Sequence, residues 1–448
     1  MPKMTASDVK QTMQRAEATA ARVGADIPLD SVLTAQEWEQ LHRDVFDGSD
    51  TLEHLRDYAR AHYVPPVAFL LVTLTRIAAA SYPTTVNAGL GPTPLNAYLV
   101  LVGDSGMGKD SVISRSTKAY SLIRTSFPEV LEERPLGSGE SLVSAFMSPA
   151  PDKDDPAPKP NPRVLFTETE ISNAETLMKR DGATLRQNLL KLYSGSTVGN
   201  ATKNSVDTVA GGTYSTGLII GAQRGRVGAL LDNPDDGLPH RFMWTELLDP
   251  NVPSQLPKVG PELDAVQLPK AGTVIRACDK ASRQVKQRSR LRLTKGYTGG
   301  LDSHLLLTRV RVAALLAVFR GHAEEHGFTD DDWRRAGALV AYSKKVRESC
   351  NERLQASAVV KQMTREEAEY AARRKRIHQL VYKALKDSEQ VRVSEITNPQ
   401  RRWRNDAGDM IAELVHAKAI RYVDKQCWII CKGEAWQDFV ASLSTRPK

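Results

Sequence analysis

The residues best suited to chemistry in this 448-residue chain form a glycine-rich run with the sequence GDSGMGKDS. It fits the pattern G-x-x-x-x-G-K of a phosphate-binding loop. Glycines let backbone N–H groups turn inward around phosphate oxygens, and a lysine in register adds a mobile positive charge. The run therefore predicts an ATP site rather than a simple glycine turn, formed by Gly103, Asp104, Ser105, Gly106, Met107, Gly108, Lys109, Asp110 and Ser111.

One residue of this run departs from the pattern. Asp110 follows the lysine, where Ser or Thr is expected to ligate Mg²⁺. A carboxylate can also ligate Mg²⁺, but it places negative charge near the phosphates. Ser111 is one position further on and could replace the missing hydroxyl only with a backbone shift. Asp110 is therefore a candidate metal ligand.

A second element, residues 163–170, reads RVLFTETE. An apolar strand ending in carboxylates is typical of the segment that holds the Mg²⁺ shell and orients the attacking water. Glu168 and Glu170 are two apart, so they face the same side of an extended strand. We assign Glu168 to the metal shell and Glu170 to water activation, or the reverse. The alternative is a solvated strand end.

Two further polar residues follow similar signals. Glu140 lies in the run LGSGE before a helix, where it is either part of an N-terminal cap or a second candidate for the catalytic carboxylate. Gln223 follows the apolar run GLIIG and is a candidate to contact the γ-phosphate.

Three arginines are candidates for contact with an anion. Arg241 stands at the start of an expected strand, where a fixed guanidinium could neutralise γ-phosphate charge in a neighbouring subunit. Arg224 and Arg226 could contact phosphate, DNA or a neighbour. A surface salt bridge is the alternative for each.

The elements around these residues predict an α/β fold. Apolar runs at 96–102, 164–166, 217–221 and 240–247 read as strands and alternate with helical stretches, which favours a mostly parallel sheet. Residues 67–80, VAFLLVTLTRIAAA, contain an arginine and are too short to span a bilayer, so we expect a buried core helix and no membrane partner.

Four regions follow from this pattern. They are an N-terminal helical region (1–90, with helices over 5–24, 36–47 and 51–64), a P-loop core (91–250), a linker at 251–271 with a helical bundle (251–360), and a winged-helix-like domain (361–448). In the last, a long helix from near Arg365, the strand VRVSEI, a short helix near RRW, a helix over 406–417 and a hairpin give the winged-helix order.

Charge indicates a polyanionic partner. Lys and Arg exceed Asp and Glu by 8 in the chain. A helix over 276–295 carries eight basic residues and one acid, and residues 365–432 carry 15 basic and 10 acidic residues. DNA contact is therefore expected through the helix 276–295 and the winged helix 364–436, helped by Lys179, Arg180 or Lys203. Protein contact is the alternative for the winged helix.

Cysteine usage and the N-terminus indicate the compartment. The chain has four cysteines, which excludes a disulfide scaffold, and Cys427 and Cys431 have no second pair at zinc-finger spacing. The N-terminus shows no apolar targeting segment. We expect a cytoplasmic protein.

Together these motifs resemble the P-loop ATPases of actinobacterial phages, plasmids and integrated elements, which are helicase-like or associated with primases. The resemblance covers about residues 48–345 and rests on LEHLRDYARAHYVPPVAFL, VGDSGMGKDS, RPLGSGESL, VLFTETEISNAETLMKRDGATLRQNLLKLYSG and DGLPHRFMW. It implies a RecA-like core, tolerance of Asp after the lysine, and a homo-oligomer, expected to be a hexameric ring, with ATP between subunits.

Three functions remain open from the sequence. The first is a DNA-dependent ATPase, a replicative helicase or initiator of a mobile element. The second is a nucleotide-switched DNA-binding regulator or defence ATPase that does not unwind DNA. The third, a small-molecule kinase, leaves the winged helix and the basic helix unexplained.

Overall fold

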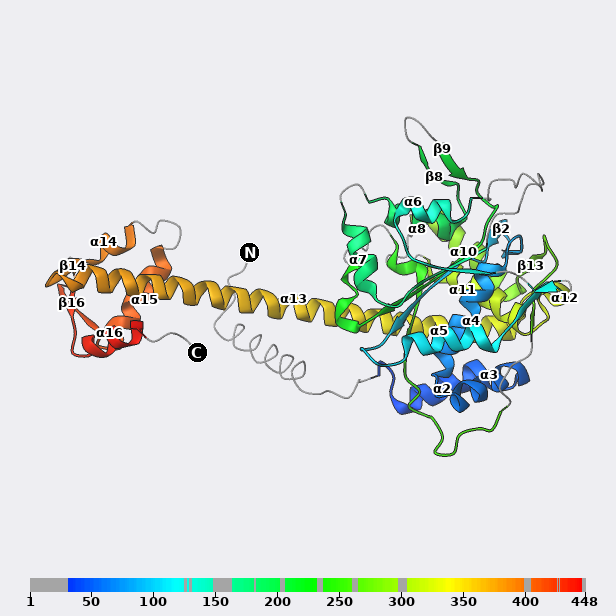
Figure 1. Ribbon diagram of the computed structural model, residues 1–448, viewed down its shortest axis with the longest axis horizontal. Helices are drawn as coiled ribbons and strands as arrows, with labels where there is room; N and C mark the ends of the chain where they lie inside the picture. The colour runs from blue at the N-terminus through cyan, green and yellow to red at the C-terminus, as the bar shows by residue number, and fades with distance from the viewer. Residues whose placement is uncertain are drawn as a thin grey trace, which may run out of the picture. The chain divides into compact units, whose positions relative to one another are not determined.

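The computed structural model describes residues 31–124, 127–128, 131–147, 163–180, 183–201, 206–231, 237–259, 265–296, 304–398, 404–424, 426 and 428–444 (Figure 1). The described residues fall into two compact units, 31–355 and 356–444, which we treat separately. The expected helix over 5–24, Lys203 and the RRW run at 401–403 lie outside the described residues.

The first unit is built on a parallel sheet of five strands, which confirms the expected α/β class. In order across the sheet they are β11 (Phe242–Glu246), β3 (Ala97–Val102), β10 (Thr216–Ala222), β7 (Val164–Glu168) and β6 (Glu132–Pro135). The four strands with apolar runs, β11, β3, β10 and β7, were predicted because strands buried on both faces are continuously hydrophobic. The edge strand β6, with the sequence EERP, was missed because it has no such run.

Helices cover both faces of this sheet (Figure 1). On one face lie α4 (Pro66–Ala80) and α5 (Lys109–Ala119), and on the other lie α6 (Gly139–Ser144) and α8 (Leu185–Ser194). Every residue of α4 is buried, so the expected core helix is confirmed. A Cβ on Gly217 of β10 would lie 2.6 Å from the Thr75 carbonyl oxygen of α4, so the helix approaches the sheet as closely as glycine allows.

Smaller elements complete the first unit. They include the helices α2 (Ala35–Phe46), α3 (Asp50–Ala61), α7 (Ile171–Lys179), α9 (Gly228–Leu231), α10 (Asp279–Lys295), α11 (Leu305–Phe319) and α12 (Ala323–His326), the short strands β1 (Thr85–Asn87), β2 (Pro92–Pro94), β4 (Leu122–Arg124), β5 (Phe127–Pro128), β8 (Val198–Ala201), β9 (Val206–Val209), β12 (Val266–Gln267) and β13 (Val274–Arg276), and the 3-10 turns Arg224–Arg226 and Pro239–Arg241.

Two sequence expectations in this unit are corrected. The basic helix does not start at Arg276, because residues 274–276 form β13 and pair in parallel with β1. Its first helical residue is Asp279. The expected linker at 251–271 contains β12, which pairs with β4. Both strands are too short to show a sequence period of their own.

A single helix, α13, runs from Asp330 to Lys386 and belongs to both units. The sequence predicted two helices, the second starting near Arg365. They are one because residues 338–386 contain neither Gly nor Pro to break the helix.

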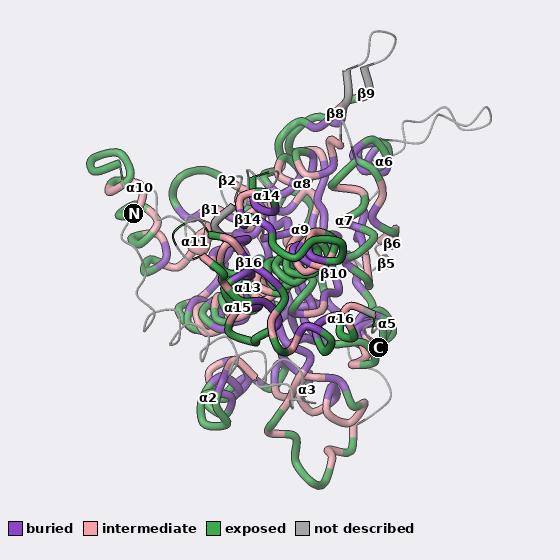
Figure 2. Tube along the Cα trace, turned by 90° about the vertical axis from the view of Figure 1, so that its left-hand side faces the viewer, coloured by how far each residue is buried: buried purple, intermediate pink, exposed green. Residues whose placement is uncertain are grey.

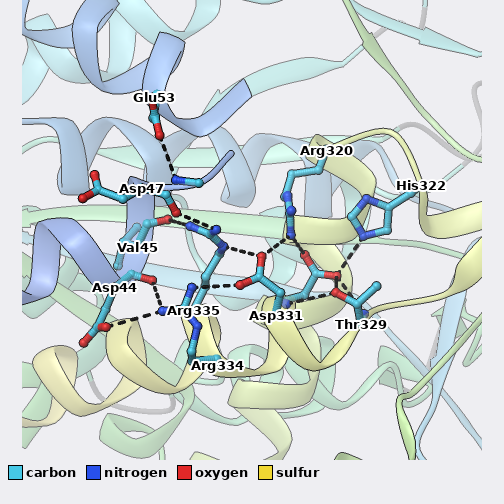
Figure 3. Close-up of polar contacts among 12 residues, drawn as sticks. Asp44, Val45, Asp47, Glu53, Arg320, His322, Thr329, Asp331, Arg334 and Arg335 are labelled. Atoms are coloured by element: carbon cyan, nitrogen blue, oxygen red, sulfur yellow. Dashed lines mark hydrogen bonds and ion pairs between the residues drawn. The ribbon is translucent and has the colours of Figure 1, made fainter. Parts of the chain in front are cut away.

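The first turn of α13 is fixed by a polar network (Figure 3). Thr329 and Asp332 form a reciprocal capping pair, with N–H to side-chain oxygen distances of 2.8 and 3.3 Å. Arg335 donates to the carbonyl oxygens of Val45 and Asp47, at 2.7 and 2.8 Å. These are terminal carbonyls of α2 that have no partner within their own helix, so α13 ties α2 to the core.

The second unit combines the end of α13 with β14 (Gln390–Arg392), α14 (Val393–Thr397), α15 (Arg404–His416), β15 (Ile420–Asp424), β16 (Ile429–Lys432) and α16 (Trp436–Ser444). Its sheet is antiparallel with the order β14-β16-β15. The run VRVSEI is only partly a strand, since residues 393–397 are helical. Helix, strand, helix, helix and hairpin follow one another in this unit.

Among the described residues, no single helix is long and apolar enough to cross a membrane. Only α3 and α4 taken together meet the criteria of length and composition, and they are bent by 116° relative to each other.

Candidate functional site

The parallel sheet brings the candidate residues to one edge. In register, Val102 pairs with Ala222, Glu168 with Ile220, and Thr167 with Pro135. The carboxyl ends of β3, β6, β7 and β10 therefore meet, which is the edge where open α/β sheets bind ligands. The residues at or after the ends of these strands include the loop 103–108, Glu140, Glu168, Glu170 and Gln223.

The loop 103–108 connects β3 to α5 and depends on its glycines. Gly106 and Gly108 have φ values of 85° and 78°, in the region that favours glycine. A Cβ on Gly103 would lie 2.9 Å from Leu247 Cδ1. The strand, glycine loop and helix expected from the sequence are therefore present.

Lys109 is the first residue of α5 and is only 7% exposed. Its Nζ donates to the carbonyl oxygens of Gly103 and Asp104, at 3.0 and 3.1 Å. A Cβ on Gly221 of β10 would lie 2.8 Å from Lys109 Cδ, so the lysine stem crosses the sheet edge where β10 ends. The ammonium is thus held inside the loop, where an incoming phosphate can take over its hydrogen bonds.

The two faces of β7 carry different side chains. Leu165 lies on the α4 face, because its Cδ1 is 2.9 Å from the position of a Cβ on Gly217. Thr167 and Thr169 follow on that face by strand alternation, and both line one pocket with Asp110 of α5. Phe166 lies on the opposite face, against Phe146, with ring centroids 5.8 Å apart.

Glu168 belongs to the face of Phe166. It is half-buried and accepts a 2.5 Å hydrogen bond from Asn173 Nδ2 of α7 and a 3.4 Å bond from the Glu170 N–H. Glu170 is exposed and directly precedes α7. Both glutamates lie at the loop edge, but the strand does not direct Glu168 toward α5.

The pocket shared by Asp110, Thr167 and Thr169 has a volume of about 240 Å³. It offers hydroxyls and the carboxylates of Asp110 and Glu133, the hard oxygen donors that Mg²⁺ prefers, and Lys118 lines it as well. The described residues contain no cluster of three or more His, Cys, Asp or Glu that could hold a metal by itself. Mg²⁺ in phosphate sites uses one or two carboxylates plus the phosphates, so the donors here fit that ion.

Glu140 and Gln223 lie at the same edge in different settings. Ser138 caps α6 by accepting from the Ser141 N–H at 3.3 Å, so the serine forms the expected cap. Glu140 is exposed in the first turn of α6. Gln223 is half-buried at the end of β10, between the phosphate-loop strand and β7. Its position fits contact with a terminal phosphate.

The arginines divide between core and surface. Arg224 is 3% exposed and forms an ion pair with Glu246, so it is a core residue rather than an external contact. Burial lowers the pKa of its guanidinium, and the nearby Arg353 lowers it further. Arg226 is exposed.

Arg241 lies at the opposite end of the sheet. It directly precedes β11, whereas the phosphate loop follows the parallel strand β3, so the two are separated by the length of a five-residue strand, about 17 Å. Its Nη1 donates to the Gly237 carbonyl at 2.7 Å, and its guanidinium is 5.9 Å from the Tyr193 ring centroid. The structure does not bring Arg241 to the loop of its own chain.

The basic helix α10 is largely solvent-exposed (Figure 2), and only Ala281 is buried in it. A groove of about 590 Å³ separates it from α11 and α13. Its basic side chains are therefore accessible along most of the helix.

Part of the basic run in the second unit is engaged internally. Arg373 pairs with Asp406 at 2.6 Å, and Arg374 pairs with Glu413 at 2.9 Å, both across to α15. Counting charges along the sequence missed these pairs, because the acids follow more than 30 residues later.

Thr167, Thr169 and Gly221 were also missed as site residues. The sequence did contain a signal for the threonines. Successive side chains of a strand point to opposite faces, so Thr167 and Thr169 lie on one face of β7 and the glutamates on the other. Gly221 carries no chemical signal, and only the approach of Lys109 shows why a side chain is excluded there.

Comparison of the chain with protein-family models and with curated proteins gave no match to either. The assignment of function therefore rests on the site itself.

Proposed function

We propose that this protein is an ATPase with a RecA-like P-loop core that couples ATP hydrolysis to movement along DNA, as a replicative helicase or initiator. The observation that carries the proposal is the loop 103–108, which joins a central parallel strand to α5 and encloses the nearly buried Lys109 ammonium. Strand, glycine loop, lysine and helix N-terminus together suit a polyphosphate.

Different residues of the chain would bind the phosphates and accept the proton of the attacking water. Backbone N–H groups of the loop and the N-terminus of α5 hold the phosphates, and Lys109 moves from its loop carbonyls to the β- and γ-phosphate oxygens. Glu170, exposed at the edge, accepts a proton from the attacking water. Gln223 contacts the γ-phosphate. Bound Mg²⁺ would be held by Asp110 and would supply positive charge that neutralises the phosphates.

Arg241 supports an oligomeric form of this mechanism. A guanidinium about one strand length from its own loop cannot reach that loop's γ-phosphate, but it can serve the loop of a neighbouring copy. We propose a ring, expected to be hexameric, in which Arg241 of one copy completes the site of the next.

DNA contact is proposed for two regions. Helix α10 carries exposed basic residues with few acids to pair them. The second unit has the element order and sheet order that we assign to a winged helix, although Arg373 and Arg374 are occupied by α15. Exposed cations that neutralise DNA phosphates release counterions, so binding should weaken steeply with salt.

The experiment is steady-state ATP hydrolysis without DNA, with single-stranded DNA and with forked duplex. We expect hydrolysis that DNA stimulates, and its loss in Lys109→Ala. The matched control is Lys118→Ala, an exposed lysine at the other end of the same helix.

The outcomes separate the functions. Turnover that survives Lys109→Ala contradicts the ATPase proposal. Turnover that DNA does not change contradicts the motor and favours a nucleotide-switched regulator or defence ATPase.

A further inference from the structure

The phosphate-loop pattern normally takes its two Mg²⁺-binding groups from two elements. The helix after the lysine provides a hydroxyl, and the strand two positions across the sheet provides a carboxylate. In this chain the helix position holds Asp110. The strand face directed toward α5 holds Thr167 and Thr169, and all three line the same pocket.

We infer that the two groups have exchanged places, so that the Asp110 carboxylate and the Thr169 hydroxyl form the protein's share of the Mg²⁺ site. The inference rests on the proposed function and refines it. The ligand that β7 provides to Mg²⁺ is the Thr169 hydroxyl and not the Glu168 carboxylate that the sequence predicted.

Two independent contacts place Thr169 beside the phosphate loop. Its side chain lines the pocket with Asp110, and its carbonyl oxygen is 2.3 Å from the position of a Cβ on Gly221. The same Cβ would lie 2.8 Å from Lys109 Cδ. Thr169 and Lys109 therefore flank one glycine, whereas Thr167 is set further back on the strand. This makes Thr169 the hydroxyl nearer the loop.

The contacts of Glu168 point the same way. It lies on the face of Phe166, and its carboxylate accepts from Asn173 and from the Glu170 backbone. These bonds connect the end of β7 to the first turn of α7. Glu168 is thus a positioning residue that orients Glu170, and it leaves the pocket beside α5 to Asp110.

The exchange does not change the number of negative charges that the protein brings to the ion. A helix hydroxyl with a strand carboxylate and a helix carboxylate with a strand hydroxyl each bring one negative charge and two oxygen donors to the ion. The exchange therefore removes the difficulty of an added negative charge near the phosphates.

The test uses the full chain with a non-hydrolysable ATP analogue and Mn²⁺ in place of Mg²⁺, and it measures bound Mn²⁺ by electron paramagnetic resonance. Asp110→Ser recreates the usual loop and leaves Glu133, which already accepts from Thr117, as the remaining carboxylate of the pocket. We expect it to weaken Mn²⁺ binding by about tenfold or more. Asp110→Ser combined with Thr169→Asp returns one carboxylate from the strand and should restore most of the affinity.

Two controls keep the outcome specific. Glu133→Gln changes a carboxylate of the same pocket that already accepts from Thr117 at 2.8 Å, and it should leave Mn²⁺ binding unchanged. Glu168→Gln should lower ATP turnover with little change in Mn²⁺ affinity. Asp110 is exposed, so its replacement does not threaten folding.

The result that overturns the inference is Mn²⁺ binding that survives Asp110→Ser and is lost in Glu168→Gln, or that fails to return in the double variant. Wild-type protein that binds no nucleotide analogue would instead overturn the proposed function, and this inference with it.

Discussion

At the start of α13 the charged side chains are bonded to one another, whereas the two aspartates at the glycine loop face solvent. Asp332 is completely buried and accepts from Arg320 at 2.6 Å and Thr329 at 2.8 Å. Asp104 and Asp110 are exposed.

Both regions lie in the first unit, and both combine a helix N-terminus with carboxylates or glycines. The two regions differ in whether their polar groups are bonded within the protein, and this difference separates a structural role from a binding role. A network whose bonds are satisfied internally fixes the packing of helices, and its loss exposes buried charge. A loop whose polar groups remain open can exchange water for a ligand. Substitutions should therefore separate stability from activity.

The largest effect is expected at the loop. Lys109→Ala should lower ATP turnover by about 100-fold or more, because the ammonium that neutralises phosphate charge is lost. The free energy of unfolding should change by less than about 1 kcal/mol, since the freed loop carbonyls can bind water. Turnover and urea unfolding of the same preparation measure both. A large loss of stability would make Lys109 a structural residue like those of α13.

The opposite result is expected at Arg335, which is 2% exposed and holds the end of α2. Arg335→Ala should lower the free energy of unfolding by about 3–5 kcal/mol, because it leaves the carbonyls of Val45 and Asp47 without their donor and removes one of the arginines paired with Asp331. ATP turnover per folded molecule should stay unchanged. Its neighbour Arg334, with a side chain 47% exposed, is the control, and Arg334→Ala should cost less than about 1 kcal/mol. Equal costs would contradict the comparison.

A smaller effect concerns DNA. Replacing Arg290, Arg292 and Lys295 of α10 with Gln should lower the slope of log affinity against log salt by about 2–3, if each contacts one phosphate. Three cations that pair with carboxylates elsewhere, Arg43, Lys270 and Lys345, provide a charge-matched control. Fluorescence anisotropy with labelled DNA across a salt series gives both slopes. Identical slopes would exclude α10 as a DNA contact.

The smallest effect is a pH dependence of stability. Burial by itself raises the pKa of Asp332, but hydrogen bonds from His322 and Thr329 outweigh it, so the pKa lies below its usual value. A carboxyl with a lowered folded pKa stabilises the protein above its unfolded pKa of about 3.9, and this contribution is lost as the pH falls further.

Urea unfolding between pH 7 and pH 3 measures this loss. Asp332→Asn should flatten the acid limb of the profile, and Asp44→Asn, at the exposed partner of Arg334, should leave it as in wild type. An acid limb that Asp332→Asn does not change would assign the loss to other carboxyls.

Much of the first unit could be predicted from local signals. The apolar runs of β3, β7 and β10 and the glycine loop are each contained in one segment, and their type follows from period and composition. The edge strand β6 and the pairing of β13 with β1 could not be predicted. Short strands without an apolar run form only because a neighbouring strand supplies their hydrogen bonds.

The candidate site also has a part that could be predicted from the sequence and a part that could not. Lys109 and its loop were identified from spacing alone, because the loop and its helix are continuous in sequence. The roles of Asp110, Thr169 and Glu168 depend on which face of β7 meets α5, and that depends on the order of strands across the sheet. Arg224 and Arg241 looked alike in sequence, but the fold buries one against Glu246 and places the other at the far edge.

By itself, the sequence determined the α/β class, the buried helix α4 and the glycine loop that ends at Lys109, because each depends on interactions within one short segment. The tertiary structure alone decided which side chains share the pocket beside the loop and which arginines are paired. These depend on residues far apart in the chain, whose contacts exist only after the sheet and helices have packed.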